Sequence, residues 1–87
     1  MTDEQKQQTR ERIGQRIAAL RNVAGLTQAQ LADKAGMQRS HISRIEAGSL
    51  AVTLESIEAI AEALGMTVDL IDPRLADMAP LKALTGK

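Results

Sequence analysis

Apolar residues recur at helical spacing in four segments of the chain, and a glycine follows each segment. The stripe of the first segment steps by four, three and four residues, the spacing of one buried helix face: Ile13, Ile17, Leu20 and Ala24. It predicts a helix over roughly residues 9–24, and a start as early as Glu4 makes residues 1–8 a polar extension of that helix. The glycines mark the expected helix ends, because glycine adopts a positive φ easily: Gly25, Gly36, Gly48 and Gly65.

The second segment is short and is expected to end in a sharp bend. Thr27 is its predicted N-cap, and Gln30, three residues further on, completes a capping-box pattern. The residues turned inward are Leu31, Ala32 and Ala35. Because Gly36 ends this helix and the next one starts soon afterwards, the pattern predicts two short helices joined by a glycine bend.

The third predicted helix covers roughly residues 38–47. Ile42 and Ile45 define its inner face. The opposite face is small and basic: Ser40, Ser43, Arg44 and Ala47. The side of this helix that is expected to face outward therefore has no bulky apolar side chain.

The fourth predicted helix follows Thr53, which is its expected N-cap. Its apolar positions step by three, four and three: Leu54, Ile57, Ala61 and Leu64. The acidic residues lie outside this stripe: Glu55, Glu58 and Glu62. Residues 66–71 contain β-branched side chains in loose alternation, which fits either a short strand or an extended segment, and Pro73 ends it. Residues 73–87 are predicted to be a tail with one or two helical turns.

The composition excludes several classes of protein. Eighty-seven residues suffice for one small core. Cysteine is absent and His41 is the only histidine, so we expect no disulfide, no metal and no cofactor. Phe, Tyr and Trp are also absent, which excludes base stacking as a binding mode. No apolar run approaches the roughly 18 residues of a membrane span and the amino terminus is polar, so no membrane contact and a cytoplasmic location are expected.

Charge is distributed unevenly along the chain, although the formal net charge is zero. Residues 1–48 carry eight basic and five acidic side chains, a net charge of +3, and residues 49–87 carry −3. This asymmetry favours an anionic partner for the first half. The alternative is that these charges only solvate helix faces.

A helix whose outer face has small and basic side chains, and which follows a glycine bend, can enter the major groove of DNA. This groove is about 12 Å wide. Arg39 and Arg44 are the candidates for hydrogen bonds to guanine, because an arginine fork matches the O6 and N7 acceptors. Ser40 and Ser43 complete the expected base-reading set. The start of the preceding helix, with Thr27 and Gln28, presents N–H groups and a partial positive charge that suit a phosphate.

The run LTQAQLADKAGMQRSHISRIEAG, from Leu26 to Gly48, resembles the helix-turn-helix of the phage-repressor and Cro-like family, also called the XRE family. With the flanking helices the resemblance covers about residues 10–71, and it implies a lambda repressor-like domain over residues 9–72, a compact all-α bundle of four or five helices.

The same resemblance implies roles for single residues. Gln28 falls on the family's phosphate-contacting glutamine, and the positions that commonly touch bases hold Arg39, Ser40 and Arg44. Arg21 and Glu46 fall on positions that form an ion pair in several members. Where the family often has a capping Ser or Thr, this chain has Gln38, so a weaker cap is expected. The full set of expected phosphate contacts is Thr27, Gln28, Gln38, His41 and Arg16.

The function expected from these features is sequence-specific binding of double-stranded DNA by a transcriptional regulator, in particular a repressor. One helix reads few base pairs, so a homodimer on a near-palindromic operator is expected. The apolar residues outside the motif are its predicted interface: Leu50, Val52, Met66, Val68, Leu70 and Ile71.

A second hypothesis treats the chain as an antitoxin that covers a toxin protein and represses its own operon. The acidic and apolar carboxyl third would then bind the toxin, and a neighbouring toxin-like reading frame would favour this alternative. An enzyme or histidine phosphocarrier is disfavoured, because no carboxylate at helical spacing orients His41.

Overall fold

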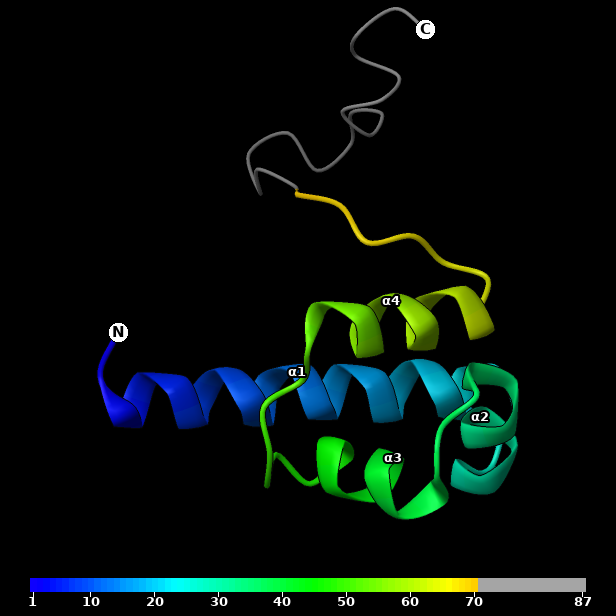
Figure 1. Cartoon of the computed structure of the whole chain (residues 1–87), viewed down its shortest axis with the longest axis horizontal. Helices are drawn as coiled ribbons and strands as arrows, with labels where there is room; N and C mark the ends of the chain where they lie inside the picture. Colours follow the sequence, from blue (N-terminus) through cyan, green and yellow to red (C-terminus); the bar gives the residue numbers. More distant parts are fainter. Residues whose placement is uncertain (71–87) are drawn as a thin grey trace, which may run out of the picture.

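The computed structural model describes residues 1–70, which form four helices. They are α1 (Asp3–Val23), α2 (Gln28–Ala35), α3 (Arg39–Glu46) and α4 (Leu54–Ala63). In the view of Figure 1, α4 lies above the long helix α1 and α3 below it, and α2 lies near the carboxyl-terminal end of α1. The predicted all-α fold is therefore confirmed.

The carboxyl-terminal part of the chain differs from the helical bundle in having no regular secondary structure over residues 66–70. Residues 66–70 are extended but pair with no strand within the described part of the chain, so the strand alternative is wrong there. A strand needs a hydrogen-bonding neighbour, and the described residues supply none. Ile71 and the predicted tail, residues 73–87, lie outside the described residues.

Side chains at the helix starts explain where the helices begin. Thr2 and Gln5 form a reciprocal capping box, so α1 begins at Asp3, well before residue 9. The predicted capping box of Thr27 and Gln30 is present at α2, and Thr53 caps α4. Gln38 makes no side-chain cap to α3, which agrees with the expected weaker cap.

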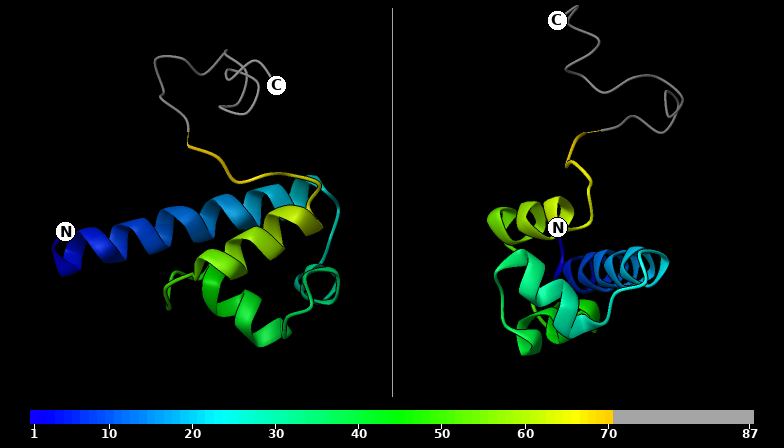
Figure 2. Two further views of the ribbon diagram at one scale, coloured as in Figure 1. Left: turned by 45° about the horizontal axis from the view of Figure 1, so that its top comes forward. Right: turned by 90° about the vertical axis from the view of Figure 1, so that its right-hand side faces the viewer.

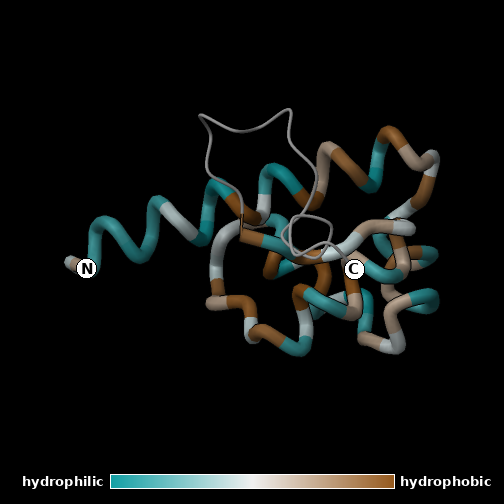
Figure 3. Tube along the Cα trace, turned by 90° about the horizontal axis from the view of Figure 1, so that it is seen from above, coloured by the Kyte–Doolittle hydropathy of each residue, from teal (hydrophilic) through white to brown (hydrophobic). Residues whose placement is uncertain are grey.

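The amino-terminal turns of α1 project beyond the rest of the bundle (Figure 2). These turns are hydrophilic in Figure 3, and residues 1–8 are exposed. The short helices gather around the other half of α1 (Figure 2), which carries the buried Ile17. The polar extension therefore belongs to α1 but adds no core.

The turn between α2 and α3 depends on one glycine. Gly36 has φ 69° and ψ 32°, the left-handed conformation that glycine adopts without a Cβ penalty. The N–H of the next residue, Met37, then donates to the carbonyl of Ala32 at 2.8 Å. This closes α2 and sends the chain directly into α3.

The core is built from aliphatic side chains of all four helices. Its largest fully buried members are Leu31, Ile42, Ile45 and Ile60, with Ile17 and Ala32 completing the buried cluster. The predicted inner face of α3 is thus confirmed. In α4 the prediction is wrong at one position, since Leu54 is 70% exposed while Ile60 is 1% exposed. Leu54 is the first residue of α4, and the buried residue of this helix is Ile60, six positions further along.

Gly14 is buried in the middle of α1, where this helix meets the end of α3. A Cβ at this position would lie 2.7 Å from the carbonyl oxygen of Glu46 and would also overlap that of Ile45. Glycine costs helix stability of roughly 1 kcal/mol relative to alanine in a helix interior. Here it allows the backbones of α1 and α3 to approach closely.

Candidate nucleic-acid interface

The outward face of α3 carries the residues expected to read bases. Ile42 and Ile45 are fully buried, so the opposite side of this short helix is turned to solvent. Arg39, Ser40 and Arg44 are exposed there, while Ser43 is half-buried. The guanidinium groups of Arg39 and Arg44 and the hydroxyl of Ser40 therefore share one accessible helix face.

The residues expected at phosphates lie around the starts of α2 and α3. Thr27 is exposed, and its hydroxyl accepts the N–H of Gln30 at 3.1 Å. Gln38 is exposed at the start of α3, and His41 is half-buried one turn later. Thr27 thus gives part of its hydrogen-bonding capacity to the helix cap, whereas the Gln38 side chain makes no cap.

Arg21 and Glu46 form an ion pair between α1 and the last residue of α3. Arg21 Nε lies 2.7 Å from Glu46 Oε2, and Arg21 Nη2 lies 3.0 Å from Oε1, so the contact is bidentate. The side chains are only 13% and 7% exposed, respectively. Arg21 Nη1 also donates to the carbonyl of Leu26 at 2.8 Å, and so fixes the loop that leads into α2.

Gln28 joins this ion pair through its side-chain amide. Its Nε2 donates to Glu46 Oε1 at 3.0 Å, which links the first residue of α2 to the end of α3. Sequence reasoning assigned Gln28 to phosphate and Glu46 to Arg21 but missed their mutual contact. No local pattern signals it, because the two residues are 18 positions apart.

These contacts alter the pKa of both charged groups. Burial opposes the charge of Glu46, but the hydrogen bonds from Arg21 and Gln28 and the guanidinium charge outweigh it, so the pKa of Glu46 lies below its ordinary value. The hydrogen bond to Glu46 raises the pKa of Arg21. Both groups are therefore charged at neutral pH.

Replacing Glu46→Gln should make the stability of the protein less sensitive to acid. A carboxyl group with a depressed folded-state pKa contributes its full stability above the unfolded pKa of about 4.3, and loses it as the pH falls through the lower folded value. At pH 7 we expect the variant to be less stable by about 1 kcal/mol, because a neutral hydrogen bond replaces a charged one. Urea unfolding between about pH 7 and about pH 3 should show the two proteins converging at the acid end, and a constant difference would contradict the assignment.

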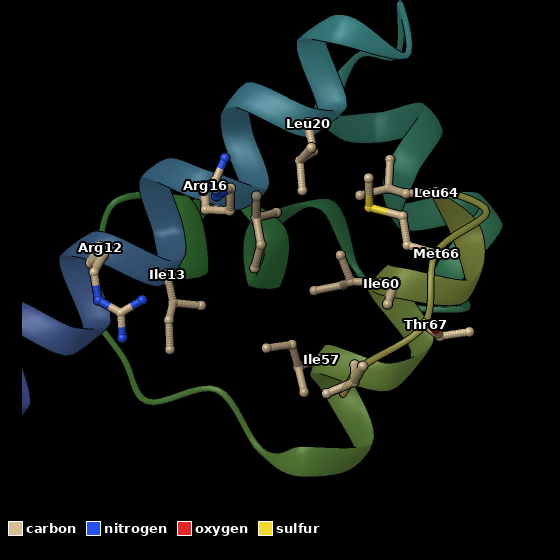
Figure 4. A pocket seen from close by; sticks show the side chains of 12 residues that line it. Arg12, Ile13, Arg16, Leu20, Ile57, Ile60, Leu64, Met66 and Thr67 are labelled. Carbon is tan, nitrogen blue, oxygen red and sulfur yellow. The ribbon is translucent and has the colours of Figure 1, made fainter. Parts of the chain in front are cut away.

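Arg16 lies apart from the other expected phosphate contacts. It lines a hollow of about 200 Å³ between α1 and α4, together with Arg12 and apolar residues such as Ile57 and Met66 (Figure 4). This hollow lies between α1 and α4, whereas Arg39 and Arg44 belong to α3, so Arg16 stands on a different part of the surface.

The residues expected at a dimer interface divide into two groups. Met66, Val68 and Leu70 are exposed, at 43%, 47% and 85%. Leu50 and Val52 are instead half-buried, because they pack against the core. Ile71 lies outside the described residues.

Residues 1–70 contain neither a membrane-spanning helix nor a cluster of metal-binding side chains. No helix in this range has the length and apolarity needed to cross a bilayer. Nor does this range bring three or more His, Cys, Asp or Glu side chains together in an arrangement that could hold a metal ion.

The chain is similar to regulators from a phage and from bacteria. An immunity repressor protein of Bacillus phage phi105 is 46% identical over 59 residues, which are 68% of this chain and 41% of that protein. The uncharacterized HTH-type transcriptional regulator y4dL of Sinorhizobium fredii is 34% identical over 65 residues, or 75% of this chain and 33% of that protein. The chain thus spans less than half the length of either relative.

A solved structure has the same fold. The restriction-modification controller protein C.AhdI of Aeromonas hydrophila aligns with a TM-score of 0.66 and 35% sequence identity, over 76% of this chain and 92% of that one. The sequence family described as a helix-turn-helix domain matches residues 12–73, which include α2, the Gly36 turn, α3 and α4. The chain therefore belongs to the helix-turn-helix domain family, in its phage-repressor or XRE-like form.

Proposed function

We propose that this chain binds double-stranded DNA sequence-specifically and acts as a transcriptional repressor. The observation that carries the proposal is the exposed face of α3, where Arg39, Ser40 and Arg44 face solvent while Ile42 and Ile45 anchor the helix. A helix of this kind fits the major groove, and the guanidinium group of an arginine can donate two hydrogen bonds to the O6 and N7 atoms of guanine. The similarity to a phage repressor and a controller protein supports the same function.

Helix α2 contributes the sequence-independent part of the proposed binding. Its first residue is Gln28 and its cap is Thr27, so unpaired N–H groups and the positive end of the helix dipole meet at this point. A DNA phosphate seated there would set the register of α3 in the groove. Gln38 and His41, near the start of α3, are the other proposed phosphate contacts.

The proposed repressor is a homodimer, because one short helix cannot read enough base pairs. Its interface would use Met66, Val68 and Leu70, which expose apolar surface beside the hollow between α1 and α4. Two copies related by a twofold axis would present two α3 helices about 34 Å apart to successive major grooves.

Selection of bound fragments from a random duplex pool tests this function directly. We expect enrichment of a near-palindrome with half-sites about one helical turn apart, since a twofold dimer reads the same bases twice. Enrichment of a single half-site would contradict the homodimer and would leave the exposed apolar residues for another protein, as the antitoxin alternative requires. The absence of any enrichment would contradict sequence-specific binding.

A further inference from the structure

We infer that Glu46 is a positioning residue for the proposed phosphate contact, because it holds the side-chain amide of Gln28. This goes beyond its tie to Arg21, and it rests on the proposed function. Three hydrogen bonds meet at its carboxylate: two from Arg21, at 2.7 and 3.0 Å, and one from Gln28 Nε2, at 3.0 Å.

The chemistry of the partners fixes the orientation of the amide. A carboxylate only accepts hydrogen bonds, so Gln28 must turn its nitrogen, not its oxygen, toward Glu46. The NH₂ group has two N–H donors, and the carboxylate takes one of them. The second N–H remains for an anion at the start of α2, where Gln28 is the first helical residue.

A carboxylate beside the proposed phosphate-binding position would ordinarily repel DNA. Here Arg21 neutralises it through a bidentate contact in a setting where both side chains are largely buried. Arg21 also holds the carbonyl of Leu26, directly before the Thr27 cap. The ion pair therefore presents Gln28 with a fixed acceptor without leaving a net charge beside the phosphate.

A purely structural role for Glu46 leads to a different expectation. Glu46 is the last residue of α3, so its contact with Arg21 could serve only to hold this helix on α1. Losing that tie would shift α3 and disturb base reading by Arg44. Losing the positioning role would instead disturb only the contribution of Gln28.

Double-mutant cycles on full-length protein separate these roles. Affinity is measured for a duplex that carries the selected sequence and for a scrambled duplex, with Gln28→Ala, Glu46→Gln and their combination. We expect Gln28→Ala to weaken both duplexes about tenfold, since it removes a hydrogen bond to a charged group. Glu46→Gln should weaken binding severalfold, because its side chain no longer imposes one orientation on the amide. In the Gln28→Ala background, Glu46→Gln should have almost no further effect.

The controls distinguish positioning from folding. In an Arg44→Ala background, Glu46→Gln should cost the same factor as in the wild type, since the two contacts are independent. Gln8→Ala removes an exposed glutamine from the projecting part of α1 and should leave affinity unchanged. Glu46→Asp is the second variant: it keeps the charge but shortens the reach, so it should also lose the coupling to Gln28. Urea unfolding of each variant verifies that it is folded in the binding assay.

Each remaining outcome counts against the inference. An equal cost of Glu46→Gln with and without Gln28 would assign Glu46 a structural role only, and tighter binding by Glu46→Gln would mean that its charge merely repels DNA. If either occurred in a protein that still needed Arg44 for binding, the proposed function would stand without this inference. If the wild-type protein bound no duplex, the proposed function and this inference would both be contradicted.

Discussion

The substitution Gly14→Val is expected to lower the free energy of unfolding by about 3 kcal/mol, the upper part of the usual range for overpacking. Gly14 lies where α1 touches the end of α3, and even a Cβ would stand 2.7 Å from the Glu46 carbonyl oxygen and overlap that of Ile45. Neither neighbour is a flexible side chain that could turn away. The two helices must therefore separate, which also loosens the packing of Ile45 in the core.

Urea unfolding measures this loss, and Ala19→Val is the matched control. Ala19 is exposed on the same helix, so the control introduces the same side chain without the overlap and should cost only a few tenths of a kcal/mol, from helix propensity. Gly14→Ala should fall between the two. Equal stability of Gly14→Val and Ala19→Val would contradict the close approach of α1 and α3.

Replacing Arg44→Ala should weaken binding to the selected operator about 100-fold or more. One bidentate contact to guanine is worth about 1–3 kcal/mol, and both protomers of a dimer would lose it. Arg44 is exposed on α3 opposite the buried Ile42 and Ile45, so its removal leaves the core intact. The preference at one base position in each half-site should relax, while binding to a scrambled duplex should weaken much less.

Two variants separate base reading from general charge. Arg44→Lys keeps the positive charge but lacks the planar guanidinium group that donates two parallel hydrogen bonds. This variant should therefore lose the base preference while retaining most of the non-specific affinity. Arg16→Ala changes the net charge as Arg44→Ala does, but Arg16 lines the hollow on the α4 side of α1, so the base preference should not change. Equal losses on selected and scrambled duplexes would show that Arg44 contacts phosphates alone. Relaxed base preference in Arg16→Ala would contradict the placement of the reading face on α3.

The arrangement of the three contacts at Glu46 connects fold and proposed function. The side chains of Arg21, Gln28 and Glu46 come from α1, α2 and α3, and their hydrogen bonds join the three helices at one point. The same point lies at the start of α2, where the phosphate is proposed to bind. The stability of the domain and the register of the proposed DNA contact therefore depend on the same few atoms.

Local signals in the sequence were sufficient for much of the fold. The Thr27 and Gln30 capping box and the Gly36 turn are encoded within a few residues, because caps and positive φ depend on neighbouring groups. The spacing of Ile42 and Ile45 was sufficient to identify the buried face of α3, and hence its outward face. Helix α1 begins at Asp3, one residue before the earlier of its two expected starts, because the capping box of Thr2 and Gln5 fixes this end.

Only the tertiary structure decided which residues meet across the bundle. Periodicity placed Leu54 in the buried stripe and did not indicate Ile60, whereas the packing of α4 buries Ile60 and leaves Leu54 exposed. A glycine within a helical pattern does not reveal that a carbonyl lies against it, and the sequence does not say on which side of α1 Arg16 stands. Backbone hydrogen bonding makes helix ends a local property, whereas the contacts of Gly14, Arg16 and Gln28 arise only when distant helices dock.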